Sequence, residues 1–421
     1  MTRVSRFRWR IDCLWRRRAP SSPLSEHVRH VSRARPRSSG LTRMWACVAL
    51  ALLANGSRAE PIVPTHDDEV IETLPTVIGS RGEDRRARRL LAQQPMDAPL
   101  ALSLAKRYLE QAHASGDPRY AGMAMAAIEA WRTDATAPEA VLLMRASIQQ
   151  YLHQFDAAVT TLQQLLSRSR NQPQAWLTLA TVRRVQGRYV ESDRACEQLL
   201  RAHVTLFGNA CLAENAALRG EIELARKAFS ALLVSSATAA ETQAWLATSV
   251  AELEQRAGRS AAADRAYRRA FRLAPDAYTA LAYADFLLEH RRPALALAVL
   301  HDQARTDAVL LRLAIAGTQA GAPGAVGDVA EMRSRIALAN ERPDAKLYHG
   351  REQAMFALAI DHDARSALAL AQGNVTQQRE PLDLLVLAQA AHASGDANAL
   401  QGARRLMDEV GLVDARINAL L

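Results

Sequence analysis

Aromatic residues are scarce in this chain, and long apolar runs are missing from it. Phe, Trp and Tyr make up only 5% of its 421 residues, and no sustained stretch alternates β-branched with polar residues. These shortages disfavour a sheet-based fold, and the leucine- and alanine-rich composition predicts an almost wholly helical protein. No apolar run approaches the about 20 residues that cross a bilayer as a helix.

The common catalytic and cofactor motifs are also missing. There is no glycine-rich loop joining a strand to a helix, no GxSxG, no HExxH and no paired CxxC. The acidic stretch at His66, Asp67 and Asp68 is flanked by prolines and is typical of a solvated segment rather than a metal site. We therefore predict a protein that is not an enzyme and holds no cofactor or metal ion.

Excess positive charge is confined to the N-terminal part of the chain. Residues 1–43 hold twelve arginines and two acidic residues, a net charge of +10, and Arg58 adds one positive charge. The whole chain has a net charge of +9. From Glu60 onward the chain is therefore slightly acidic, with a net charge of about −2. The high isoelectric point says nothing about the later residues, and we predict that they do not bind nucleic acid.

An export signal is predicted in the same N-terminal part. Trp45–Ala54 is an apolar core preceded by four arginines within residues 33–43, and small residues stand at Ser57 and Ala59. This order of basic, apolar and small residues predicts cleavage before Glu60 and a periplasmic protein. The alternative is that this segment is not cleaved and anchors the chain to the membrane as a helix. In either case the chain contacts the membrane only through this segment.

A helix-hairpin pattern recurs about every 34 residues and is clearest between Pro173 and Pro275. The turn glycines Gly187, Gly220 and Gly258 are 33 and 38 residues apart, and apolar residues around them recur at helical spacing. One helix of this length is too short to be stable alone, so neighbouring hairpins must supply the missing apolar surface. The pattern predicts a stacked solenoid, which offers partners an extended surface.

Four regions follow from this pattern. Residues 1–59 are the leader, and 60–84 form an extended acidic arm. Regular helical repeats occupy 85–275, and divergent repeats of the same kind occupy 276–421. The sequence His-Ala-Ser-Gly-Asp occurs at 113–117 and again at 392–396, where we expect glycine to end one helix and aspartate to cap the next.

Two cysteines, Cys196 and Cys211, follow the leader. They lie on the second helix of one predicted hairpin and the first helix of the next, which pack together in a solenoid. In an oxidising compartment these positions predict a disulfide. The alternative is a pair of buried, unbridged thiols that fill small-residue positions.

The repeats resemble the tetratricopeptide (TPR) family. The matching positions are Trp176, Ala180, Gly187 and Tyr189 in one unit, Gly220, Ala225 and Phe229 in the next, and Gly258, Ala263, Tyr267, Ala270 and Pro275 in the third. The resemblance is specific over about 139–275 and extends by analogy over 98–410. It implies an all-α, right-handed α-solenoid of antiparallel helix hairpins, a TPR-like superhelix, in which Trp131, Trp176 and Trp245 are packing residues.

The resemblance also implies a binding face. In the TPR family the first helix of each hairpin lines the concave groove, which here gives Gln150, Tyr151, Gln174, Thr181, Arg184, Glu214, Glu252, Gln255 and Arg256. This set mixes both charges with amides and lacks the basic cluster that clamps a peptide carboxylate. The alternative is a solvated face with no ligand.

Three functions are compatible with these features. The resemblance to exported bacterial TPR proteins implies a non-catalytic adaptor in the cell envelope that binds a protein or peptide in its groove. A second possibility is binding of a glycan or cell-wall polymer, for which the face offers mainly Tyr151 and Trp245 as stacking surfaces. The third is a cytoplasmic regulator that keeps residues 1–59 and contacts nucleic acid through them.

Overall fold

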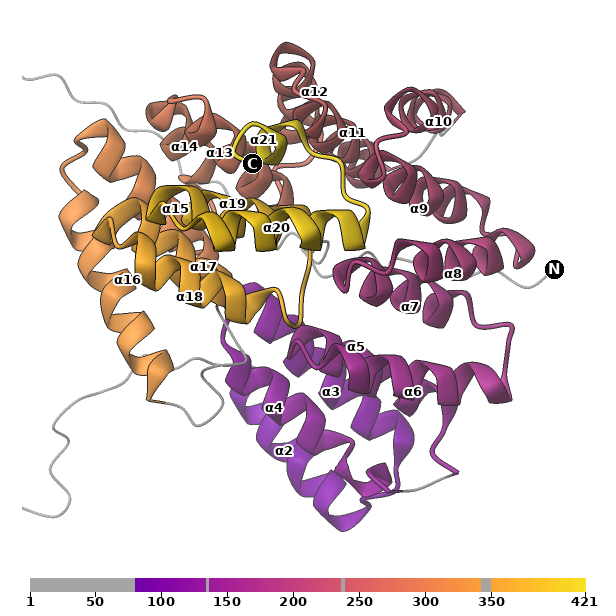
Figure 1. Cartoon of the computed structure of the whole chain (residues 1–421). Helices are drawn as coiled ribbons and strands as arrows, with labels where there is room; N and C mark the ends of the chain where they lie inside the picture. Colours follow the sequence, from indigo (N-terminus) through magenta and orange to yellow (C-terminus); the bar gives the residue numbers. More distant parts are fainter. Residues whose placement is uncertain (1–79, 134–135, 236–238, 342–349) are drawn as a thin grey trace, which may run out of the picture. The chain divides into compact units, whose positions relative to one another are not determined.

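The computed structural model describes residues 80–133, 136–235, 239–341 and 350–421, and every regular element in these ranges is helical (Figure 1). The predicted leader 1–59 and most of the predicted arm 60–84 lie outside the described residues. Helix α2 (Ser80–Gln93) begins inside the predicted arm, earlier than expected. Glu83 lies in its first turn, where a negative charge stabilises the helix N-terminus.

The following helices pair in chain order as hairpins (Figure 1). In each pair we call the earlier helix the first helix and the later one the second helix. The pairs are α3 (Ala98–Ser115) with α4 (Pro118–Ala127), α5 (Glu139–Tyr151) with α6 (Phe155–Arg168), α7 (Pro173–Val185) with α8 (Tyr189–Arg201), α9 (Thr205–Leu218) with α10 (Ile222–Ser235), α11 (Ala240–Arg256) with α12 (Ser260–Leu273), α13 (Ala277–Glu289) with α14 (Pro293–Leu300), α15 (Asp307–Ala320) with α16 (Ala325–Asn340), α17 (Gly350–Phe356) with α18 (Ala364–Asn374), and α19 (Pro381–Ser394) with α20 (Ala397–Val410).

The hairpins stack in sequence. Each first helix from α3 to α19 contacts the next first helix, and second helices such as α6, α8 and α14 pack on the first helix that follows them. The predicted all-α fold of stacked sequential hairpins is therefore confirmed. Short irregular turns extend two helices: Glu129–Trp131 follows α4 as a 3-10 turn, and Ala357–Asp361 follows α17 as a π turn.

Small side chains allow the helices to approach closely. Ala175, Ala210 and Ala244 on successive first helices are fully buried. Gly208 lies so near α8 that a Cβ atom at this position would be 2.6 Å from Cδ2 of Leu200. Alanine and glycine at such crossings keep neighbouring helix axes at the short end of the usual 8–10 Å range.

The predicted packing role of the tryptophans is confirmed for two of them. Trp131 and Trp245 are only 2% and 6% exposed. Trp176 is half-buried, and its Nε1 donates a hydrogen bond of 2.8 Å to the carbonyl oxygen of Arg170. A buried or half-buried indole with a satisfied N–H anchors packing, and it presents little ring surface to a ligand.

The repeated His-Ala-Ser-Gly-Asp turn adopts the predicted caps in both places. Gly116 and Gly395 follow α3 and α19 with φ of +71° and +68°. The carboxylate of Asp117 accepts from the amide of Arg119, and that of Asp396 accepts from the amide of Ala399. Glycine avoids the Cβ clash of the left-handed conformation, and aspartate satisfies a free amide of the next helix.

Four residues other than glycine also adopt a positive φ: His153, His203, Arg291 and His362. His203 is exposed, between α8 and α9, with φ of +59°. We expect His203→Gly to raise the free energy of unfolding by about 0.5–1 kcal/mol, because it removes a strained conformation that L-residues adopt at a cost. Chemical denaturation measures the change.

His301→Gly is the matched control for this prediction. His301 is exposed as well but lies in the right-handed helical region, with φ of −51°. The same exchange is expected to lower stability by about 0.5–1 kcal/mol there, because glycine loses more backbone freedom on folding. Equal effects of the two substitutions would contradict the conformational explanation.

The predicted region of divergent repeats, 276–421, includes residues that follow the last hairpin. Residues Val410–Leu421, which we call the C-terminal segment, begin at the last residue of α20 and contain the short helix α21 (Ala415–Asn418). Leu412 and Ile417 are buried, and α21 contacts α19. The repeat period could not reveal this segment, because a single four-residue helix outside the hairpins repeats no pattern.

Candidate functional site

All nine residues predicted for the groove lie on four successive first helices: α5, α7, α9 and α11. Their exposure is uneven. Thr181, Gln255 and Arg256 are buried, whereas the other six are partly exposed. The surface that these helices present is therefore narrower than the sequence predicted.

A row of polar side chains crosses three of these helices. Nη1 of Arg184 on α7 lies 2.5 Å from Oε2 of Glu214 on α9, and the hydroxyl of Ser249 on α11 donates to Oε1 of Glu214 at 2.9 Å. We call these three residues the polar row. Glu214 is thus held between its two neighbouring first helices.

A second set of polar contacts lies at the C-terminal end of α11. Gln255 Nε2 donates to Oε2 of Glu289 on α13 at 2.7 Å, and Oε1 of Gln255 accepts from the hydroxyl of Tyr267 at 2.7 Å. Burial raises the pKa of Tyr267 well above its usual value, so this hydroxyl remains a donor. Gln255 therefore connects two helices and is not free to bind a ligand.

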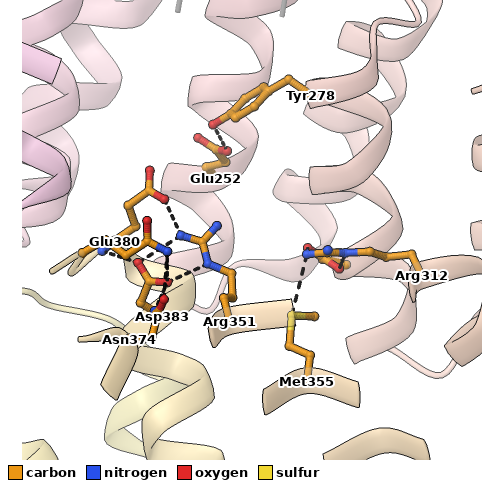
Figure 2. A network of polar contacts seen from close by, with 10 residues as sticks. Glu252, Tyr278, Arg312, Arg351, Met355, Asn374, Glu380 and Asp383 are labelled. Carbon is orange, nitrogen blue, oxygen red and sulfur yellow. Dashed lines mark hydrogen bonds and ion pairs between the residues drawn. The ribbon is translucent and has the colours of Figure 1, made fainter. Parts of the chain in front are cut away.

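Several other predicted groove residues make contacts within the stack. The hydroxyl of Tyr151 donates to the carbonyl of Ala112 at 3.0 Å, and that of Thr181 donates to the carbonyl of Leu177 at 3.0 Å. Tyr278 donates its hydroxyl hydrogen to Glu252 at 2.5 Å (Figure 2). Gln150 and Gln174 are half-buried on α5 and α7.

A buried ion pair on the later first helices was not predicted from the sequence. Arg312 on α15 is almost fully buried and donates to both carboxylate oxygens of Asp285 on α13, each at 2.9 Å. The same guanidinium lies 3.8 Å from Sδ of Met355 on α17 (Figure 2). The available signal was an arginine alone in the apolar run Leu310–Leu313, since such a residue must find a partner when it is buried.

A larger buried network surrounds Arg351 on α17 (Figure 2). Its guanidinium donates to both oxygens of Asp383 on α19, at 2.6 and 3.0 Å, and to Glu380 at 2.5 Å. Asp383 is 1% exposed and also accepts from Nδ2 of Asn374 at 2.7 Å and from the amide of Glu380 at 2.8 Å. These bonds fix the start of α19 against α17 and leave no reactive group unpaired within the network.

The two cysteines are joined by a disulfide between α8 and α9, with their Cα atoms 5.8 Å apart. Both side chains are buried. Asn215 lies beside the bridge, where its Nδ2 donates to the buried hydroxyl of Ser192 at 2.9 Å and lies 3.8 Å from Sγ of Cys196.

Within the described ranges, no three His, Cys, Asp or Glu side chains are grouped so that they could hold a metal ion. The same ranges contain no helix with the length and apolarity needed to cross a membrane. What the first helices offer is hydrogen bonding and ion pairing with both signs of charge.

No protein-family model matches this chain, and no curated protein matches it. Several solved structures are similar in fold. A tetratricopeptide repeat protein from Parabacteroides merdae is 15% identical, covering 55% of this chain and 92% of its own, with a TM-score of 0.38. A Rap protein complexed with competence and sporulation factor is 12% identical over 78% of this chain and 92% of its own, with a TM-score of 0.43. Yeast Tom70 is 11% identical over 78% and 82%, with a TM-score of 0.36.

Proposed function

We propose that this chain is a non-catalytic scaffold of the bacterial cell envelope, which binds a protein or peptide partner on its first helices. The observation that carries the proposal is the polar row, because it crosses three helices and mixes both charges. The Arg184 and Glu214 side chains are 18% and 19% exposed, so a partner can reach them while their ion pair holds them in place. Side chains that are already ordered lose less entropy on binding.

Removal of the two charged residues of the polar row is expected to weaken partner binding at least tenfold, or about 1.4 kcal/mol. The variant is Arg184→Ala with Glu214→Ala, so that neither charge is left without its partner. The mature chain and the variant are immobilised, and the amount of each captured envelope protein is compared by quantitative mass spectrometry. The dissociation constant of the main captured protein is then measured.

Lys227→Ala is the control for this experiment, because Lys227 is exposed on the second helix α10. This variant should retain the partner with unchanged affinity. Full retention by the polar-row variant as well would contradict a partner site at Arg184 and Glu214.

The envelope location rests on the signal pattern before Glu60 and on the Cys196–Cys211 pair, since disulfides persist in oxidising compartments. We expect the protein isolated from the periplasm to begin at Glu60, as N-terminal sequencing determines. A cytoplasmic protein that retains residues 1–59 would contradict this location. Salt-sensitive nucleic-acid binding through that leader would then become the next measurement.

A further inference from the structure

The C-terminal segment follows the turns that join first to second helices, a surface that we call the turn edge. A Cβ atom on Gly187 would lie 2.9 Å from Cγ2 of Val410, and one on Gly220 would lie 2.9 Å from Cγ2 of Val413. A Cβ atom on Gly258 would lie 3.4 Å from Cβ of Ala415. Successive residues of the segment thus meet the turns of successive hairpins.

Main-chain hydrogen bonds accompany these contacts. The amide of Val413 donates to the carbonyl of Leu218, the last residue of α9, at 2.9 Å. Just before α19, the amide of Arg379 donates to the carbonyl of Val185, the last residue of α7, at 2.6 Å. Helix C-termini carry carbonyls without a partner in their own helix, and an extended chain can supply the missing donors.

An ion pair fixes the far end of the segment. Nη1 of Arg416 lies 3.3 Å from Oε2 of Glu289, at the end of α13. Val410, Val413, Ala415 and Arg416 therefore meet four consecutive hairpins in chain order. The segment is helical at Val410, Ala415 and Arg416 and has no regular structure at Val413, and in this form it contacts one repeat after another.

The segment leaves a buried donor beside it unsatisfied. The hydroxyl of Tyr189 has no hydrogen-bond partner among the described residues. Tyr189 packs in the same apolar cluster as Val410, Leu412 and Ile417. Buried donors without acceptors cost free energy, so a segment that supplies acceptors there would fit this surface better.

The turn edge also continues beyond the segment. Next to the turn of α7 and α8, a cleft of about 580 Å³ separates the α5–α6 turn (Leu152–Ala157) from Thr376, Gln377 and Glu409. A polypeptide longer than the C-terminal segment could therefore extend along this edge past Gly187.

We propose that the turn edge is a peptide-binding surface separate from the polar row. The C-terminal segment occupies this surface, and a partner peptide binds there by displacing it. The partner that it fits is a polypeptide segment of the same conformation, without regular structure over residues 412–414 and with a short helix after them. Its side chains are small or β-branched opposite Gly187, Gly220 and Gly258, and an arginine reaches Glu289. Because residues 411–421 lie outside every helix hairpin, they can leave this surface without opening one.

The test uses the full mature chain and a labelled peptide of residues 409–421. Leu412→Asp with Arg416→Glu is the release variant, because it places charge in the apolar cluster and repels Glu289. We expect this variant to bind the peptide at least tenfold more tightly than the wild type. In the wild type the C-terminal segment competes with the peptide at an effective concentration of about a millimolar. A peptide carrying Arg416→Glu should bind the release variant at least tenfold more weakly.

Arg405→Glu is the matched control, since Arg405 is exposed on α20. It should behave as the wild type does. Equal peptide binding by the wild type and the release variant, or no binding by a folded release variant, would overturn the proposal. None of these outcomes depends on a partner that binds the polar row. That proposal is tested separately by the variant Arg184→Ala with Glu214→Ala.

Hydrogen exchange of the wild type decides the question even if the release variant fails to fold. If the C-terminal segment can be displaced, it also detaches transiently without unfolding of the rest. The amide hydrogens of Leu412–Ile417 should therefore exchange at least tenfold faster than those in the middle of α19. Exchange of both sets at one common rate would show that the segment leaves only on global unfolding, and the proposal would be wrong.

Discussion

Arg351→Met is expected to lower the free energy of unfolding by about 3–5 kcal/mol at neutral pH. The substitution leaves the buried carboxylate of Asp383 without the cation that donates to both of its oxygens. Asn374 and the amide of Glu380 still donate to it but bring no positive charge. Chemical denaturation of the variant and the wild type at the same pH measures the loss.

This loss should shrink as the pH falls. Burial raises the pKa of Asp383 to about 6 in the wild type, while the Arg351 charge lowers it. A carboxyl whose pKa is higher in the folded than in the unfolded state contributes stability below its unfolded pKa, near 3.8, and loses it as the pH rises through the folded pKa. Without Arg351 the folded pKa rises further, so variant and wild type should differ most above pH 7 and least near pH 4.

The double variant Arg351→Met with Asp383→Asn serves as the control. Asparagine keeps oxygen and shape but removes the buried charge, so the double variant should be more stable at neutral pH than Arg351→Met alone. The stability of the double variant should also depend less on pH than that of Arg351→Met, because the buried titrating carboxyl is gone. If both variants lose the same stability with the same pH dependence, the unpaired carboxylate is not the cause.

Loss of the Cys196–Cys211 bridge should be the second large effect, at about 3 kcal/mol for the 15-residue separation of the two cysteines. The bridge limits the freedom of the unfolded chain between α8 and α9. Urea denaturation of the wild type, and of Cys196→Ala with Cys211→Ala, measures the effect. Reductant should destabilise the wild type and leave the double variant unchanged.

Thiol titration tests the same bond directly. The chain from Glu60 onward contains only these two cysteines, so the mature oxidised protein should show no reactive thiol even in denaturant. Two thiols should appear after reduction. Two thiols in the denatured, unreduced protein would instead favour the unbridged alternative.

The sequence predicted most of the helices because each one carries its own local signals. The repeat period, the turn glycines such as Gly220 and the capping aspartates Asp117 and Asp396 act over a few residues, and the structure places them as expected. The first-helix position of the predicted groove residues could be read in the same way.

The contacts between helices could not be read from those signals. Helical spacing places Arg312 or Gln255 on one side of its helix, but the depth at which neighbouring helices cross decides which residue it meets. Gln255 was predicted as part of an open groove and is instead bonded to Glu289 and Tyr267. Opposite charges about one repeat apart, such as Arg351 and Asp383, were the available indication of these pairs.

The hydrogen bond between Arg379 and Val185 has a consequence for how the molecule unfolds. In a linear repeat array each unit contacts only its neighbours, so unfolding can begin at an end and proceed one unit at a time. Here the approach to α19 is bonded to α7, across more than half of the described helices. This bond closes a long loop of chain. The entropic cost of closing a loop grows only slowly with its length, so a contact over this distance costs little more than one between neighbouring repeats. The hairpins between α7 and α19 should consequently melt as one cooperative block rather than fray in succession.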